Sequence, residues 1–264
     1  MMRLVFVGFI LATLHLGCRA KPLARFEWEA KGTDGNLMGY VGAVAVAPDG
    51  KVWVAEASGR FFIFDADGAF IEVWGEPGTG PGQFRFIHPP LPGESTNIKF
   101  KTLADILFLP DGSFYVMEPA NNRIQRFSVD RRLIRAWGSG LGVDAAPTGM
   151  ALRGADELLV SFQRLHEIQR FSLDGDFLGA IDLGLDQPTS SLAVDGDRTI
   201  FVATQFPPQD GVNPRGRLLV FEPDGKPRRT LGLSQEGFVG LSFEHFIDID
   251  EAGRCVVSDE WMIA

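Results

Sequence analysis

The sequence predicts an all-β protein, a β-propeller built from four-stranded antiparallel blades. A turn followed by a short apolar strand recurs five times, and a pair of strands joined by a tight turn follows four of these copies. No amphipathic helical pattern of useful length follows the first twenty residues. Five repeats are recognisable, and we expect six blades in the complete ring.

The first recurring pattern is a polar turn that leads into an apolar strand. It occurs as "VAPDGKVWVAE", "FLPDGSFYVME", "LRGADELLVSF", "VDGDRTIFVAT" and "IDEAGRCVVSD". The valines that anchor the alignment are Val54, Val116, Val160, Val202 and Val257, with spacings of 62, 44, 42 and 55 residues. Two spacings match the roughly 40–50 residues of a propeller blade, and the other two require insertions.

The second pattern supplies two more strands to each unit. It occurs as "FIFDADGAFIEVWG", "IQRFSVDRRLIRAWG", "IQRFSLDGDFLGAIDLG" and "LLVFEPDGKPRRTLG". The Asp-Gly pairs in "DADG", "SLDG" and "EPDG" supply the positive φ angle that a tight reversal needs. Because one sheet cannot bury both of its faces, we expect the blades to pack face to face around an axis. The aromatic residues expected between blades are Trp74, Trp137, Phe64, Phe127, Phe171 and Phe221.

Two stretches carry a resemblance to a known family. "EPANNRIQRF" followed by "LIRAWG" resembles the NHL repeat, and "WGEPGTGPGQF" (residues 74–84) resembles the glycine-rich connector between two such repeats. The resemblance extends over residues 41–264, and we assign residues 21–264 to one NHL-like propeller domain. It implies a six-bladed ring of a kind that binds proteins, nucleic acids or small ligands, with some enzymes among its relatives.

The two ends of the chain are expected to meet in one blade. "ARFEWEAKG", residues 24–32, matches the last strand of a repeat, and the final repeat stops after two strands. We therefore expect residues 24–32 to form the outer strand of the closing blade, and the chain to be cut within its last blade.

The first twenty residues have the form of a secretory signal. Arg3 precedes an apolar run, Leu4 to Leu16, that is shorter than the roughly 20 residues a membrane span needs. "LHLGC" partly resembles the box that precedes the lipidated cysteine of bacterial lipoproteins, which makes Cys18 the candidate lipidation site. Ordinary cleavage after Ala20 is the alternative, as is a buried N-terminal element. We expect a protein exported to the periplasm or cell surface and held to the membrane through a lipid.

The net charge bears on the class of partner, and the position of Cys255 bears on its role. A net charge of −9 argues against nucleic acid. Cys255, the only other cysteine, lies in the apolar strand "RCVVSD" and is expected to be a buried structural thiol. We expect a monomer that binds a protein or a small-molecule ligand.

The glycines of residues 74–84 do not form a phosphate loop. Their spacing is G-x-G-x-G, Pro81 removes one backbone donor, and the proline-rich "FRFIHPPLPGE" that follows cannot start a helix. The stretch is predicted to be a connector between blades, and no cofactor is evident in the sequence.

Candidate metal ligands are few. Asp105, His245 and Asp248 lie at the starts of predicted inner strands, where they form a weak candidate set for Ca²⁺ or Zn²⁺. Glu56, Glu118 and Asp259 share one repeat position. For these three we favour the capping of a turn over a ring of metal ligands.

Two proline-rich insertions, residues 85–102 and 205–216, are the candidate binding loops. Their candidate binding residues are Arg85, His88, Asn97, Asp210 and Arg215. The favoured function is a ligand- or protein-binding scaffold at the cell envelope, in preference to an enzyme. The alternative is a metal-dependent lyase or lactonase with its site at the mouth of the central channel.

Lipidation can be tested directly. Cys18→Ser should abolish incorporation of radioactive palmitate in a bacterial host and release the protein from the membrane fraction, because acyl chains supply the membrane affinity. Cys255→Ser is the matched control and should keep both properties. A label that persists in Cys18→Ser would disprove the assignment.

Overall fold

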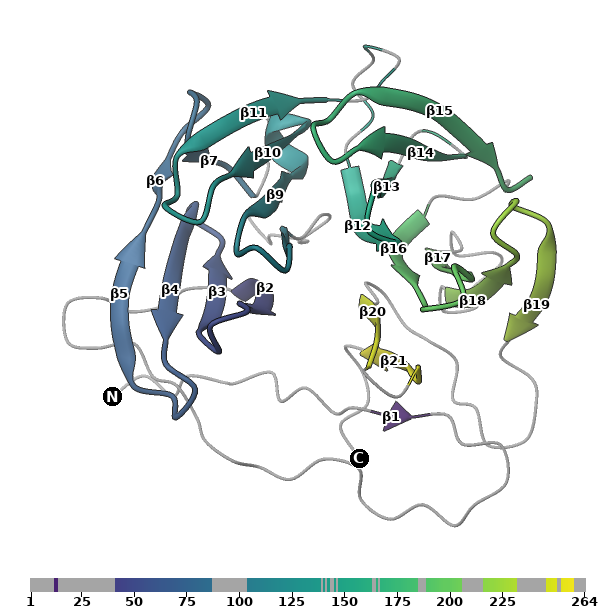
Figure 1. The fold of residues 1–264 in the computed structure, drawn as a ribbon, viewed down its shortest axis with the longest axis horizontal. Helices are drawn as coiled ribbons and strands as arrows, with labels where there is room; N and C mark the ends of the chain where they lie inside the picture. Colours follow the sequence, from purple (N-terminus) through teal and green to yellow (C-terminus); the bar gives the residue numbers. More distant parts are fainter. Residues whose placement is uncertain are drawn as a thin grey trace, which may run out of the picture.

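The computed structural model describes residues 12–13, 41–86, 104–138, 140, 142, 145, 147–162, 165, 167–184, 189–205, 216–231, 246–250 and 253–258. These residues form antiparallel sheets arranged around a central axis (Figure 1). The predicted fold class, an all-β propeller of four-stranded blades, is confirmed.

Four complete blades are present, which we call A to D. Blade A contains β2 (Val41–Val46), β3 (Val52–Glu56), β4 (Arg60–Phe64) and β5 (Phe70–Trp74). Blade B contains β8 (Asp105–Phe108), β9 (Phe114–Glu118), β10 (Arg123–Phe127) and β11 (Leu133–Trp137). Blade C contains β12 (Pro147–Arg153), β13 (Glu157–Phe162), β14 (Glu167–Ser172) and β15 (Phe177–Asp182). Blade D contains β16 (Thr189–Val194), β17 (Ile200–Gln205), β18 (Gly216–Phe221) and β19 (Pro227–Leu231).

The fifth repeat forms a smaller sheet, here called the fifth sheet. Its hairpin consists of β20 (Phe246–Ile249) and β21 (Cys255–Ser258), and β1 (Ala12–Thr13) pairs with β21. β1 belongs to the predicted signal segment, which stays a prediction. Residues 24–32 and 259–264 lie outside the described residues, so the blade number of the complete ring also stays a prediction.

Strand register confirms the alignment of the repeats. Each anchor valine on the second strand of its sheet faces the same position of the first strand. The pairs are Val44 with Val54, Ile106 with Val116, Met150 with Val160, Leu192 with Val202, and Ile247 with Val257. The first strands β2, β8, β12, β16 and β20 surround the axis (Figure 1).

The hydrophobic core is divided among the seams between blades. One buried cluster joins blades A and B, and three more join B to C, C to D, and D to the fifth sheet. At the first seam the ring of Trp74 meets that of Phe127 edge-on at 5.3 Å. Trp137 and Phe171 meet at the second seam, 6.1 Å apart, and Phe221 is buried at the third. The predicted packing between blades is confirmed for these aromatic residues.

For Phe64, the predicted packing between blades stays a prediction. Its side chain is 1% exposed, and the described members of its cluster, chiefly Val54 and Phe62, belong to blade A.

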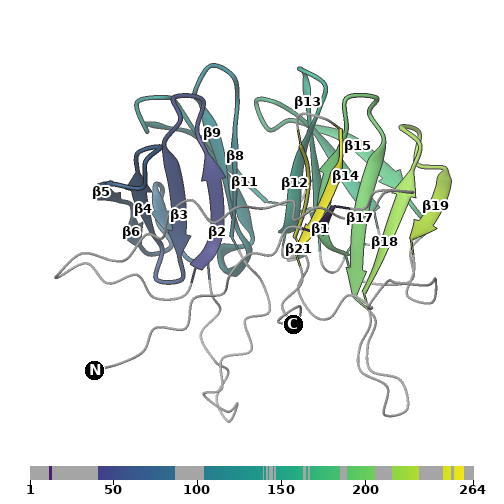
Figure 2. The ribbon, with the colours of Figure 1, turned by 90° about the horizontal axis from the view of Figure 1, so that it is seen from below.

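The propeller has two unlike faces. At most five residues separate the first strand from the second, or the third from the fourth, in each sheet that the structure describes. All these turns lie on one face, which we call the turn face, at the top of Figure 2. The second-to-third connections and the connections between blades lie on the opposite side, the connector face, because each antiparallel strand reverses the chain.

Turns between the third and fourth strands hold blades B and C against the blades that precede them. Gly175, with φ 85°, lies so close to the indole of Trp137 in blade B that an added Cβ would be 2.7 Å from Cε3. Blade B has Arg131 at this position, with φ 62°. Its guanidinium lies 5.1 Å from the ring centre of Trp53 in blade A and pairs with Glu72 at 2.5 Å. The cation–π contact and ion pair offset the roughly 1–2 kcal/mol cost of a left-handed backbone.

This seam contact predicts different outcomes for two matched glycines. Gly253 has φ 73° in a turn closed by the same type of hydrogen bond as that of Gly175, but no described atom lies within 4 Å of the place that an added Cβ would take. Gly253→Ala should lower the free energy of unfolding by about 1 kcal/mol through backbone strain. Gly175→Ala adds a clash with Trp137 and should cost about 2–4 kcal/mol. Urea unfolding measures both, and equal losses would contradict the seam contact.

Candidate functional site

The glycine-rich stretch after blade A is a closed connector. Its short strands β6 (Glu76–Pro77) and β7 (Gln83–Phe84) pair in parallel. The Gly78 N–H donates to the carbonyl oxygen of Phe84 at 2.9 Å, and the Gly80 N–H donates to Gln83 Oε1 at 3.0 Å. These bonds engage amides that a phosphate loop would direct at a ligand, so the prediction of a connector is confirmed.

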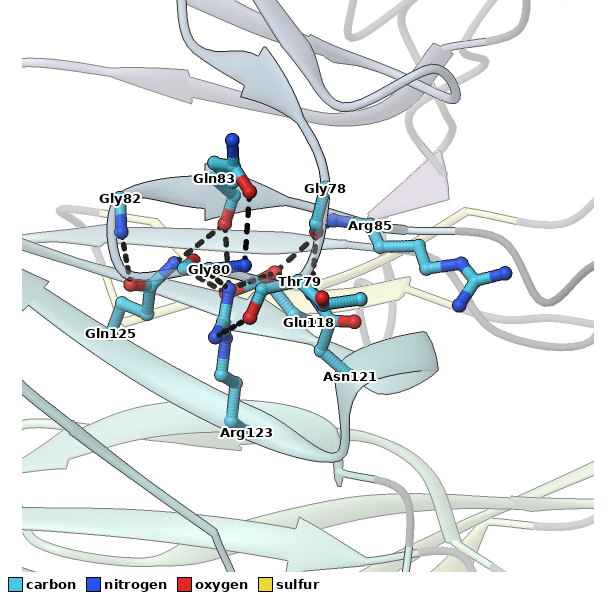
Figure 3. A network of polar contacts seen from close by, with 10 residues as sticks. All are labelled: Gly78, Thr79, Gly80, Gly82, Gln83, Arg85, Glu118, Asn121, Arg123 and Gln125. Atoms are coloured by element: carbon cyan, nitrogen blue, oxygen red, sulfur yellow. Dashed lines mark hydrogen bonds and ion pairs between the residues drawn. The ribbon is translucent and has the colours of Figure 1, made fainter.

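Glu118, at the end of β9, is the centre of a polar network beneath this connector (Figure 3). Its side chain is fully buried. The carboxylate accepts hydrogen bonds from Asn121 Nδ2 at 2.6 Å, Arg123 Nε at 2.8 Å, Gln125 Nε2 at 2.6 Å and the Arg85 backbone N–H at 3.1 Å. A buried charge requires such partners, because an unpaired carboxylate would be strongly destabilising.

Arg123 and Gln125, which bind Glu118, also form hydrogen bonds with the backbone of the connector. Arg123 donates to the carbonyl oxygens of Thr79, Gly80 and Gln83 at 2.7–2.9 Å. Gln125 Nε2 also donates to Gln83 O, and its Oε1 accepts the Gly82 N–H, each at 2.9 Å. Blade B thus binds the chain segment that leads out of blade A.

Blades C and A have simpler versions of the contacts made by Gln125 and Glu118. Gln169, which pairs with Val160 as Gln125 pairs with Val116, accepts the Gly140 N–H at 2.8 Å. In blade A, Glu56 is bonded to Ser58 Oγ and paired with Arg60. Glu56 and Glu118 therefore act on the turns that follow them, as we expected, and Asp259 lies outside the described residues.

The first strands are joined to one another by side chains near the connector face. Asp105, the first residue of β8, accepts the Ile106 N–H at 2.8 Å and, across the seam, the Met150 N–H at 3.2 Å. Ser191 occupies the equivalent register position and accepts the Ile247 N–H at 3.2 Å. Asp105 thus contributes to the contact between blades B and C, a role that the sequence did not reveal.

A cluster of hydroxyl groups lies at the connector-face ends of β12 and β16. Thr148 Oγ1 is 3.0 Å from Ser161 Oγ and 3.2 Å from Thr189 Oγ1. The beginnings of β12 and β16 are therefore polar, whereas the side chains further along these strands enter the seams. The connector-face ends of these first strands thus carry carboxyl and hydroxyl groups.

The surroundings raise the pKa of two carboxyl groups on first strands, Asp105 and Asp248. Loss of hydration raises the pKa of Asp105 to about 6, and the negative charge of Asp248 adds to the effect. Loss of hydration, with a smaller contribution from Asp250, also raises the pKa of Asp248 on β20. The charge of Asp248 thus acts on Asp105 although their strands belong to different sheets.

The predicted site residues are only partly placed. His88, Asn97, Asp210, Arg215 and His245 lie outside the described residues. Among the residues that the structure describes, no group of three His, Cys, Asp or Glu side chains could hold a metal ion. The metal set of Asp105, His245 and Asp248 stays a prediction. Arg85 uses its backbone N–H for Glu118, and its side chain points away from the network (Figure 3).

Cys255 is half-buried on β21, and loss of hydration raises the pKa of its thiol to about 11. A thiol with this pKa is almost entirely protonated at neutral pH, so it is a poor nucleophile. This agrees with the structural role expected for it. No helix in the described part of the chain is long and apolar enough to cross a membrane.

The turn face also contains a hollow, of about 370 Å³, between blades A and B. Trp53, Phe108 and Phe114 contribute to its walls. Its charged side chains already have partners: Asp49 bonds Lys51, Asp111 bonds Ser113, and Arg131 pairs with Glu72. This hollow therefore offers a ligand little unsatisfied polarity.

The chain matches no family model and no curated protein sequence. Among solved structures it is similar to a streptogramin B lyase, at 15% identity and a TM-score of 0.52, over 83% of this chain and 64% of that one. A protein of unknown function from Bacteroides caccae gives 14% identity and a TM-score of 0.54, over 82% and 69% of the two chains.

The WD40 β-propeller domain of Doa1 is similar at 13% identity and a TM-score of 0.54, over 85% of this chain and 62% of that one. At these identities the likeness shows the propeller fold alone. The chain spans less than two thirds of the length of the streptogramin B lyase and of the Doa1 structure.

The Glu118 network predicts a large loss of stability on a small change. Glu118→Gln removes the charge that Arg123 needs, and we expect the free energy of unfolding to fall by about 3 kcal/mol. Glu56→Gln is the matched control. The side chain of Arg60 is 35% exposed, so we expect that loss to stay below about 1 kcal/mol. Urea unfolding distinguishes the two, and equal losses would argue against the network.

Asp105 predicts a defined pH dependence. Its carboxyl binds a proton more tightly in the native state, with a pKa of about 6, than at the ordinary value of 3.8. Its burial therefore destabilises the fold fully above about pH 6, and this cost is relieved as the pH falls towards 4. Relative to Asp105→Asn, the wild type should gain about 2–3 kcal/mol between pH 7 and pH 4.

Urea unfolding at a series of pH values measures this gain. Asp67→Asn, which removes an exposed carboxylate on the turn face, controls for the general effect of one lost charge. If the wild type and Asp105→Asn keep a constant difference across this range, the proposed titration of Asp105 is wrong.

Proposed function

We propose that the protein is an exported, NHL-like binding propeller of the cell envelope, whose ligand or protein partner docks on the connector face. The observation that carries this proposal is that the connections between strands are short on the turn face, whereas the two proline-rich insertions begin and end on the connector face. On the turn face, at most five residues join consecutive strands of the described sheets. On the connector face, β17 ends at Gln205 and β18 begins at Gly216, and β7 ends at Phe84 while β8 begins at Asp105.

Both proline-rich insertions therefore begin and end on one side of a rigid ring. Long connections on a rigid scaffold are where binding residues concentrate. The same side carries the polar mouth of the channel, with Asp105, Thr148 and Thr189 on neighbouring first strands. On the turn face, polar side chains form hydrogen bonds within their own turns. For example, Asp65 Oδ1 accepts the backbone N–H groups of Asp67 and Ala69.

In this proposal the protein is held to the membrane only through a lipid on Cys18. The acidic net charge of −9 argues against nucleic acid as a partner. We propose that the propeller acts as a monomer. Known propellers with this fold include both lyases and binding domains, so the fold by itself does not choose between them. The choice rests on the insertions and on the structural engagement of Asp105.

Site-specific photo-crosslinking tests the docking face. A benzophenone amino acid placed at Asn97 or Asp210, in the two insertions, should yield crosslinked adducts in living cells. The same group at Asp67 or Asp224, exposed on the turn face, should not. Adducts from the turn face alone, or from all four positions equally, would refute the proposal.

The alternative function is a metal-dependent lyase or lactonase. It is supported by two carboxyl groups on first strands, Asp105 and Asp248, of which the second raises the pKa of the first. A divalent cation there would polarise a carbonyl group of the substrate. Metal analysis of the purified protein separates the alternatives. Stoichiometric Ca²⁺ or Zn²⁺ that is lost in Asp248→Asn would favour the enzyme over the binding scaffold.

A further inference from the structure

The face of blade A that points away from blade B differs from the equivalent faces of the other sheets. At those sheets, the residue opposite the anchor valine is buried against the preceding blade: Ile106, Met150, Leu192 and Ile247 are 3–6% exposed. Val44, at the same position in blade A, is 49% exposed, and Val46 is 64% exposed. The axial half of this face is therefore uncovered.

The peripheral half of the same face is buried. Val54, Phe62 and Phe64 are 7%, 0% and 1% exposed, and the half-buried Phe70 and Val73 pack against them. We call these five residues the blade A cluster. The clusters at the four other seams each join two sheets, whereas the described members of this one all belong to blade A.

Equivalent positions show what normally covers such a cluster. Phe127 in blade B occupies the position of Phe64, and Trp74 from the outer strand β5 of the preceding blade packs on it at 5.3 Å. Trp137 from β11 packs in the same way on Phe171 of blade C, at 6.1 Å. The expected occupant is thus a tryptophan-bearing outer strand.

The sequence immediately before β2 contains such a strand. Within residues 24–32, "ARFEW" aligns with "FIEVW" of β5 and "LIRAW" of β11, which places Trp28 at the position of Trp74 and Trp137. Eight residues separate Gly32 from Val41, and nine separate the end of β11 from the start of β12. In this topology the strand that precedes a first strand belongs to the neighbouring blade on that side.

We propose that residues 24–32 form the outer strand beside blade A and place the indole of Trp28 on the blade A cluster. A strand at the periphery covers Phe62 and Phe64 but leaves Val44 and Val46 open towards the axis, which is the pattern of exposure observed.

This strand also orients the propeller on the membrane, a consequence that rests on the proposed lipid anchor. Outer strands run from the turn face to the connector face, as β5 does after the turn at residues 65–69. Residue 24 would therefore lie at the turn face. Only residues 19–23 separate it from Cys18, a reach of about 20 Å. The turn face is then directed at the membrane and the connector face away from it.

A double-mutant cycle tests the strand without any lipid. Trp28→Ala and Phe64→Ala should be coupled, so that together they change the unfolding equilibrium constant at least about fivefold less than the product of the single effects. Trp28→Ala combined with Phe127→Ala, the equivalent residue in blade B, should be multiplicative. Multiplicative behaviour in the first cycle overturns the proposal.

The second copy of the chain is the competing occupant. Light scattering should give the mass of a monomer, and its value should be the same for the wild type and Trp28→Ala. A wild-type dimer that dissociates in Trp28→Ala or in Phe64→Ala would mean that another copy covers the cluster, which also overturns the proposal.

Vesicles test the orientation separately. A fluorophore on Ala66→Cys at the turn face, in the acylated Cys255→Ser background, should be quenched by brominated phosphatidylcholine more than one on Thr79→Cys at the connector face. Equal or reversed quenching disproves the orientation. The mutant cycle does not depend on Cys18, so failure of the anchor and failure of the strand give different results.

Discussion

Face-to-face burial of apolar sheets is the constraint on which the rest of this structure depends. Each blade is a thin sheet with two apolar faces, and each face is buried only when a neighbouring blade covers it. The seam between blades A and B shows the consequence. Trp53 and Trp74 from one blade interlock with Phe114 and Phe127 from the next, at ring separations of 5.1–5.7 Å.

Polar groups add to this packing at three levels across the seams, from the axis to the periphery. Near the axis, Asp105 or Ser191 accepts an amide of the next first strand. In the middle, Gln125 or Gln169 binds the incoming connector. At the periphery, the third-to-fourth turn contacts the preceding outer strand, as Arg131 does with Trp74 at 5.8 Å. The blades are thereby held in a fixed orientation, which apolar packing alone specifies poorly.

The division of the ring into two faces follows from the same topology. Antiparallel strands put the first-to-second and third-to-fourth turns on one side, and the second-to-third turns and the blade-to-blade connections on the other. Insertions in the second-to-third turns or in the blade-to-blade connections therefore begin and end on the connector face and leave the seams undisturbed. The Glu118 network is the structural support for one of them. It binds the connector up to Arg85, and the rest of the insertion continues from that anchored point.

The sequence by itself determined the fold class, the strand order within each repeat and the register, because alternating apolar residues and Asp-Gly turns are local signals. It also showed that the glycine-rich stretch at residues 74–84 is a connector, since Pro81 and the spacing exclude a phosphate loop. Only the tertiary structure decided what lies across each seam. It showed Asp105 bound to Met150, Arg131 placed in a position otherwise held by glycine, and Phe64 packed in a cluster whose described members all belong to blade A. Contacts across a seam join residues that lie far apart in the sequence, such as Asp105 and Met150, 45 positions apart. No local pattern encodes which partner a side chain meets after the blades close around the axis.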